Sequence, residues 1–302
     1  MLQKFLIQIM ELLFSVVIPS YNRAQSLLVV LDSFAKQEYP NFEVIVVDDG
    51  STDNTGEIVK AMKDPRFKYF YKINEERGAA RNFGAKLAKG DYVNFFDSDD
   101  LAYSDHLQKA AQMIAELKNP DVFHLAYEII SPEKKVIRKY NSFDGKVEKY
   151  CIKRKEVSIN SIFLRKDITQ AVPFSEIRSL SASEDALWLC QLAARYSVHY
   201  NNKITSAIID HDQRSMWIAS ENKISERKKY LAEGLKNDPV FMKKYGHLLK
   251  YINSEMSYLL CYSGLRNKNK KKGLSYFMDS VKLNPLVFFS KRTLFVAKCL
   301  LS

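Results

Sequence analysis

The sequence contains few of the residues that mark several classes of protein. Its 302 residues include only 10 glycines and 8 prolines, so no long flexible linker or low-complexity segment is expected. There are four cysteines, at Cys151, Cys190, Cys261 and Cys299, and they form no Cys-x-x-Cys pair. Their scatter argues against a disulfide framework or a structural zinc site and suits a reducing cytosol.

Long apolar runs are also missing. No stretch of about 18 uninterrupted apolar residues occurs, so we expect no membrane-spanning helix. The apolar residues 1–14 resemble a signal peptide, but they carry Glu11, lack a small-residue cleavage site and run into an expected core strand. We therefore expect a cytoplasmic protein, either soluble or peripheral on the inner face of a membrane.

Several ligand-binding motifs are absent where their folds require them. No Gly-x-Gly-x-x-Gly follows the first expected strand, and no Gly-Lys-Ser/Thr occurs, which argues against a dinucleotide-binding oxidoreductase and a P-loop NTPase. The Asp-x-Asp pattern lies far from the first strand, unlike that of a phosphatase. No glycine-rich basic loop near the N-terminus indicates a sugar-1-phosphate nucleotidyltransferase.

The charge is concentrated at one end of the chain. Residues 221–302 hold 17 Lys/Arg and 6 Asp/Glu, so this segment carries the whole net charge of +11. Such a block favours an anionic partner, although a solvated helical face is the simpler alternative. Because no nucleic-acid module is recognisable, an anionic lipid surface is the better candidate. The apolar pieces 286–289 and 294–301, interrupted by basic residues, fit an interfacial helix or equally helices that pack on the rest of the protein.

Apolar strands alternate with helical patterns along the first hundred residues. We expect strands at 14–18, 42–47, 67–71 and 91–96, and helices at 24–36, 54–62 and 78–88, the first of them capped by Asn22. This order predicts an α/β fold with a mixed, mostly parallel sheet covered by helices. Ligands of such sheets bind at the carboxyl ends of the strands, where the polar clusters 20–23, 48–49 and 97–100 lie.

The alternation loosens after Pro120. Strands are expected at 121–130, 161–164 and 204–209, a helix at 183–196, and helices throughout the segment after Glu221. We place a domain boundary near residue 218. The expected domains are 1–218, with nucleotide binding in 13–100 and the acceptor side in 101–218, and a basic helical region at 219–302.

The strongest chemical signal is an apolar strand that ends in Asp97-Ser98-Asp99-Asp100. Hard divalent cations prefer carboxylate oxygens and bind phosphates beside them, whereas crowded carboxylates without a cation repel one another. An acidic turn that caps the next helix is the alternative. A second acidic strand end, Asp48-Asp49-Gly50, offers acceptors for a nucleobase or ribose, or forms only a tight turn.

Four motifs in order resemble family 2 glycosyltransferases, which have the GT-A fold. They are SVVIPSYNR at 15–23, VDDGSTD at 47–53, GAARN at 78–82 and GDYVNFFDSDD at 90–100. The resemblance covers about residues 13–215. It implies an inverting transfer of a sugar from a nucleotide-diphosphate donor, most often a UDP-sugar, with Mn²⁺ or Mg²⁺ as cofactor.

The resemblance also implies roles for single residues. The donor would be held by Pro19, Tyr21, Arg23, Asp49, Arg77, Arg81, Asp97 and Arg214, and the metal by Asp99, with His211 as a further ligand. Asp185 would be the catalytic base and Glu184 would orient it or touch the acceptor. Read without the resemblance, the acidic pair is better explained as the first turn of a helix.

We therefore expect a hexosyl- or N-acetylhexosaminyltransferase that acts on a glycan or lipid-linked acceptor in surface polysaccharide biosynthesis. A catalytically inactive nucleotide-sugar-binding or membrane-associated module on the same fold is the alternative. The presence of Asp99, Glu184 and Asp185 argues against that alternative.

Overall fold

The computed structural model describes residues 11–141, 145–146, 152, 157–211 and 220–301. By its internal contacts the chain divides into two compact units. Unit 1 comprises Met1–Arg178 and Tyr196–Asp212, and unit 2 comprises Ser179–Arg195 and Gln213–Ser302.

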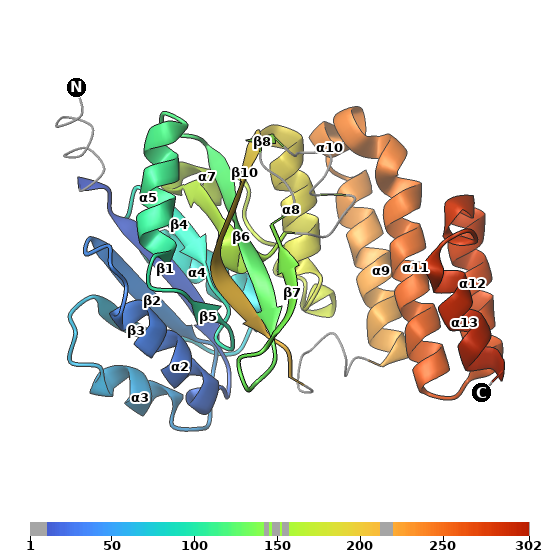
Figure 1. The fold of residues 1–302 in the computed structure, drawn as a ribbon, viewed down its shortest axis with the longest axis horizontal. Coiled ribbons are helices and arrows are strands. Elements are labelled where there is room, and N and C mark those ends of the chain that lie inside the picture. Colours follow the sequence, from blue (N-terminus) through green and yellow to red (C-terminus); the bar gives the residue numbers. More distant parts are fainter. Residues whose placement is uncertain (1–10, 142–144, 147–151, 153–156, 212–219, 302) are drawn as a thin grey trace. The chain divides into compact units, whose positions relative to one another are not determined.

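Unit 1 is built on one mixed sheet (Figure 1). The strand order is β3-β2-β1-β4-β9-β6-β10-β5, with β7 paired to β6 and β8 to β10. The strands are β1 (Phe14–Ser20), β2 (Phe42–Asp48), β3 (Phe67–Tyr71), β4 (Tyr92–Phe95), β5 (Leu101–Ala102), β6 (Val122–Ile130), β7 (Val136–Tyr140), β8 (Gly145–Lys146), β9 (Ile162–Arg165) and β10 (Val198–Ile209). Strands β1 to β4 are parallel to one another, β6 is parallel to β10, and the other pairings are antiparallel.

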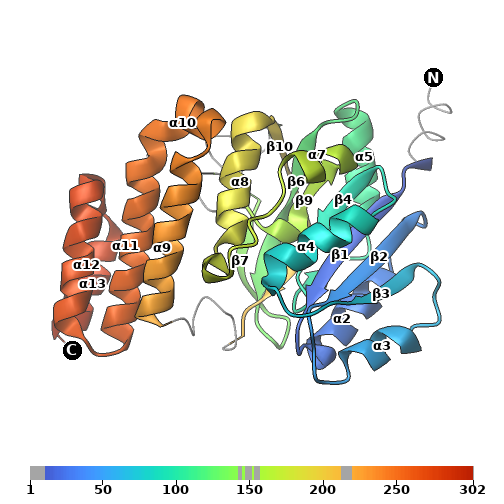
Figure 2. The same cartoon turned by 180° about the vertical axis from the view of Figure 1, so that it is seen from behind.

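Helices cover both faces of this sheet. They are α2 (Ala24–Ala35), α3 (Thr55–Ala61), α4 (Glu76–Leu87), α5 (His106–Glu116) and α7 (Lys166–Ala171). Helices α2 and α5 bury their apolar sides with Val16 and Ile18 in one core, while α4 and α7 lie on the opposite face (Figures 1 and 2). Helix α4 packs closely on β1 at Gly84. Glycine is needed there because a Cβ would lie 2.4 Å from Val17 Cγ1.

The predicted α/β fold class is confirmed, and a strand lies at each predicted place, but β5, β7 and β8 were not predicted. Two further details differ. Strand β10 begins at Val198 rather than at 204, because polar residues and two register shifts between Asn201 and Ser206 hide its pattern. Asn22 does not cap α2. Its backbone has φ 49° and its Oδ1 accepts from Thr52 N at 2.8 Å, while Asp53 Oδ2 accepts from Ala24 N at 3.1 Å.

Unit 2 is helical in the part that the structure describes. It contains α8 (Glu184–Arg195), α9 (Glu221–Lys236), α10 (Pro239–Tyr245), α11 (Leu249–Arg266), α12 (Lys270–Leu283), η4 (Pro285–Val287) and α13 (Lys291–Leu301). Helix α8 belongs here because Leu187 packs on Gly234 of α9 and Arg195 pairs with Asp238 at 2.8 Å. The contacts therefore group α8 with the C-terminal helices, and the boundary near residue 218 and its subdivisions stay predictions. No helix among the described residues is both long and apolar enough to cross a bilayer.

Candidate functional site

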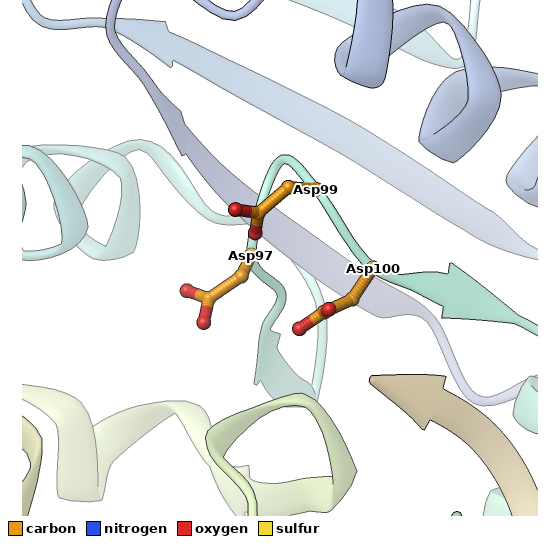
Figure 3. Close-up of side chains that lie close together, drawn as sticks. All are labelled: Asp97, Asp99 and Asp100. Carbon is orange, nitrogen blue, oxygen red and sulfur yellow. The ribbon is translucent and has the colours of Figure 1, made fainter. Parts of the chain in front are cut away.

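Three carboxylates meet in the turn after β4. Each of Asp97, Asp99 and Asp100 has an oxygen within 4.8 Å of the others, and Figure 3 shows the side chains pointing to the same side of the turn. Side chains of Asp97 and Asp99 are 26% and 19% exposed, whereas Asp100 is buried. Such a set of hard oxygen ligands fits a divalent cation, and its two accessible members are the ones that the sequence singled out.

Asn160, which sequence reasoning missed, fixes the geometry of this turn. Its Nδ2 donates to Asp100 Oδ2 at 2.6 Å, and its Oδ1 accepts from the backbone N–H of Asp97 at 2.8 Å. The other oxygen of Asp100 accepts from Ile209 N at 3.0 Å. Asp100 is thus tied to the fold through both oxygens, which leaves Asp97 and Asp99 to face a ligand.

A neutral histidine, His106, is linked to Asn160 through Asn94. His106 is fully buried, and its Nδ1 lies 2.8 Å from Thr205 Oγ1. Burial lowers the pKa of His106 to about 3, so the ring is uncharged at neutral pH. Asn94 lies 3.4 Å from the other ring nitrogen and donates to the carbonyl oxygen of Asn160 at 2.8 Å. The one sequence signal for this network is a polar Asn94 within an otherwise apolar buried strand.

Asp99 joins two predicted site residues that are far apart in the sequence. His211 Nε2 lies 3.2 Å from Asp99 Oδ2, and Arg23 Nη1 lies 3.6 Å from the same oxygen. The structure therefore brings together the aspartate and histidine that the sequence predicted as metal ligands. The predicted donor residue Arg214 lies outside the described residues.

Arg81 of α4 contacts the second accessible carboxylate. Its guanidinium is buried, donates to Asp97 Oδ1 at 2.8 Å and lies 5.2 Å from the centre of the Phe174 ring. A buried guanidinium beside a carboxylate partly neutralises it and fixes its direction. Arg77 is partly buried in the first turns of the same helix.

Asp49 is buried at the end of β2 and is already oriented. Its Oδ1 accepts from Lys72 Nζ at 2.9 Å and from Glu75 N at 3.0 Å. Burial works against the charge on Lys72, but hydrogen bonds to Glu75 and Asp49 outweigh it and raise the pKa of this lysine. Gly50 has φ +85°, and a Cβ there would lie 3.0 Å from Asn74 N, so the turn requires glycine. Sequence reasoning missed Lys72.

The end of β1 carries two further residues of the predicted donor site. Pro19 is buried in the strand, whereas the Tyr21 ring is 50% exposed and offers a face for stacking. Between them, the buried Ser20 Oγ has no hydrogen-bond partner among the residues that the structure describes. Asn22 N donates to Ser51 Oγ at 2.9 Å, so the loops after β1 and β2 are bonded to each other.

The predicted catalytic pair lies in the first turn of α8 in unit 2. Glu184 is buried and its Oε2 accepts from Ser183 N at 3.1 Å, while Asp185 is exposed. A carboxylate at a helix N-terminus is stabilised in its charged form by the helix dipole. The roles of base for Asp185 and of orienting residue for Glu184 stay predictions.

Solved structures share this fold. Residues 1–349 of Staphylococcus aureus TarS match with a TM-score of 0.65 and 22% identity over 95% of this chain and 87% of that one. The mannosyltransferase PcManGT from Pyrobaculum calidifontis, solved with GDP-Man and Mn²⁺, matches with a TM-score of 0.56 and 17% identity, over 95% of this chain and 83% of that one. At these identities the likeness establishes the fold.

Sequence relatives establish the family. A glycosyltransferase of Rickettsia felis is 30% identical over 271 residues, and one of Rickettsia conorii is 32% identical over 279 residues. Each alignment covers 88% of this chain and 44% of the relative, so the chain spans less than half the length of these two proteins. The family model described as glycosyl transferase family 2 matches residues 15–169. The chain belongs to glycosyl transferase family 2.

Proposed function

We propose that the protein transfers a sugar from a UDP-sugar to a hydroxyl group of a glycan or lipid-linked acceptor, with inversion at the anomeric carbon. The observation that carries this proposal is the set of three carboxylates after β4, held by Asn160 and contacted by Arg81, His211 and Arg23. It combines acidic ligands for a cation with basic groups for a diphosphate.

The nucleotide would lie between the ends of β1 and β2. Tyr21 offers a stacking face, and the Asp49 carboxylate would accept from the N3–H of uracil through the oxygen that Lys72 leaves free. The S. aureus TarS fragment was solved in complex with UDP-GlcNAc (TM-score 0.67, 23% identity), which supports a UDP donor. The sugar proposed to be transferred is a hexosyl or N-acetylhexosaminyl group.

Asp99 and His211 would hold Mn²⁺ or Mg²⁺, with Asp97 near the donor ribose or sugar. When bound, the cation would stabilise the diphosphate that leaves. Two sets of contacts prepare the site for the cation. Asn160 keeps Asp97 and Asp100 in place. Arg81 and Arg23 offset the negative charge of the carboxylates. PcManGT, solved with Mn²⁺, supports this choice of metal.

Asp185 would act as the general base. It would take the proton of the acceptor hydroxyl as that oxygen forms a bond to C1, while the bond from C1 to the diphosphate oxygen breaks. Glu184 would orient this carboxylate or touch the acceptor. The exposure of Asp185 supports its access to an incoming acceptor.

We place this reaction in surface polysaccharide biosynthesis on the cytoplasmic side of a membrane, with the basic helices of unit 2 attached to that surface. A relative from Erwinia amylovora, AmsB, is described as an amylovoran biosynthesis glycosyltransferase and supports this role. It is 40% identical over 113 residues, which cover 36% of this chain and 38% of that one.

The test is a binding and hydrolysis screen of UDP-, GDP- and TDP-sugars with and without Mn²⁺, repeated with Asp99→Ala. We expect metal-dependent binding of one UDP-sugar and its loss in Asp99→Ala. Asp279→Ala, which removes an exposed carboxylate of α12, is the matched control and should bind as the unchanged protein does. A folded protein that binds no donor would favour the inactive module instead.

A further inference from the structure

Five large apolar side chains project into solvent from the last two elements of unit 2. We call them the apolar ridge, and their exposed fractions are 75% for Leu286, 52% for Phe288, 84% for Phe289, 73% for Leu294 and 89% for Leu301. Single exposed apolar residues are ordinary, but several within sixteen residues mark an interaction surface.

The backbone that carries the ridge is anchored. Val287 and Val296 are buried in the same small core as Phe277 of α12. Thr293 Oγ1 donates to the carbonyl oxygen of Phe288 at 2.6 Å, which closes the turn between η4 and α13. Arg292 Nη2 donates to Glu255 Oε2 of α11 at 2.8 Å. The ridge is therefore a fixed feature of the fold whose side chains point outward because their neighbours are held inward.

Positive charge accompanies the ridge. Lys291, Leu294, Lys298 and Leu301 are spaced three or four residues apart in α13, so they share one face of the helix, and all four are exposed. No Asp or Glu occurs between residues 280 and 302. Arg292, by contrast, is neutralised by Glu255. Within the described part of the chain no carboxylate pairs with Lys291 or Lys298, so the outer face of α13 alternates apolar groups with positive charge.

We propose that the apolar ridge, with Lys291 and Lys298, inserts into the headgroup region of an anionic bilayer. Apolar side chains flanked by lysines match such a surface, because the rings and leucines reach the acyl boundary while the ammonium groups meet lipid phosphates. A second copy of the chain would bring the same lysines together and fits less well. The inference rests on the proposed function in one respect: the lipid-linked acceptor proposed above would lie at the membrane surface that the ridge contacts.

The experiment measures partition onto vesicles without donor or acceptor. Wild-type protein is floated with vesicles of phosphatidylcholine alone and with 30% phosphatidylglycerol. We expect binding to the anionic vesicles and its loss at high salt. Phe288→Ser/Phe289→Ser should weaken binding at least tenfold, and Lys291→Gln/Lys298→Gln by roughly fivefold per lysine.

The matched control is Val136→Ser/Ile137→Ser, which removes two apolar side chains of 51% and 57% exposure from β7 in unit 1. It should bind as the wild type does, and circular dichroism should show all variants folded. Failure of the wild type to bind anionic vesicles, or an equal loss in the control, would overturn the proposal. So would a dimer in sedimentation velocity that Phe288→Ser/Phe289→Ser dissolves, since a second copy would then cover the ridge. Vesicle binding without sugar transfer would contradict only the proposed function.

Discussion

Asn160 bonds Asp100 and Asp97 at once: its amide nitrogen lies 2.6 Å from Asp100 Oδ2 and its oxygen lies 2.8 Å from the Asp97 nitrogen. One side chain from the turn before β9 therefore sets the shape of the acidic turn after β4. Because the accessible carboxylates depend on that shape, Asn160 is a positioning residue for the proposed metal site.

Replacing Asn160 with alanine should weaken metal activation about 10–100-fold, the usual cost of losing an outer-shell partner of a metal ligand. The reason is that Asp97 N and Asp100 Oδ2 lose their shared partner and the carboxylates spread. The measurement is the Mn²⁺ concentration that gives half-maximal donor hydrolysis. Asn253→Ala, which removes a side-chain bond within α11, is the control. An unchanged metal requirement in a folded Asn160→Ala protein would contradict the positioning role.

Lys72→Met should raise the KM for the donor while leaving kcat at saturating donor nearly unchanged. Lys72 holds one oxygen of Asp49, so its loss should let the buried carboxylate turn away from the proposed nucleobase site. This would weaken donor binding and leave the chemical step unaffected. Lys60→Met, on the neighbouring helix α3, is the control. A fall in kcat with an unchanged KM would argue that Asp49 does not hold the nucleobase.

Asp185→Asn should reduce turnover by about 10²–10⁴-fold, the typical contribution of a general base, while donor binding persists. Because Asp185 is exposed and lies in the first turn of α8, its replacement should lower the thermal midpoint only slightly. Glu184→Gln probes the buried neighbour and should lower turnover less. Comparable activity of Asp185→Asn and wild type, with donor binding intact, would assign the base elsewhere.

Stability should fall as the pH drops below neutrality. Burial lowers the pKa of His106 and of His124 from 6.5 to about 3. The unfolded chain therefore binds protons that the folded one excludes, and stability present above pH 6.5 is lost progressively toward pH 3. Between pH 7 and 5 each histidine should cost about 2 kcal/mol.

Urea unfolding at the two pH values measures this loss. His124→Gln should show a smaller loss between pH 7 and 5, whereas the exposed His247→Gln should lose as much as the wild type. If His124→Gln and wild type lose the same stability over this interval, the buried ring does not resist protonation as stated.

Local patterns were enough to predict the elements of unit 1 that shape the site. The continuous apolar runs around Val16, Val46 and Val93 reflect strands buried on both faces, and their carboxyl ends carry the polar residues that the structure gathers. The pairing of Asp99 with His211 could be predicted from the family resemblance alone, because the two lie 112 residues apart.

Residues that act through long-range contacts could not be found this way. Asn160 belongs to no recognisable motif, and its importance arises only when β9 pairs with β4. The grouping of α8 with the C-terminal helices has the same origin. It depends on the fit of Leu187 against Gly234 and on the ion pair of Arg195 with Asp238, and neither has a local signature.

The hydrogen bonds of Asn22 with Ser51 and Thr52 bear on how donor preference can change. These bonds join the loops after β1 and β2, which we propose as the two walls around the nucleobase. Grafting either loop alone from a relative with another nucleotide would break the pair and loosen both walls. Under the proposed function, we therefore expect that changing the nucleotide selectivity requires exchanging residues 19–23 and 48–53 together.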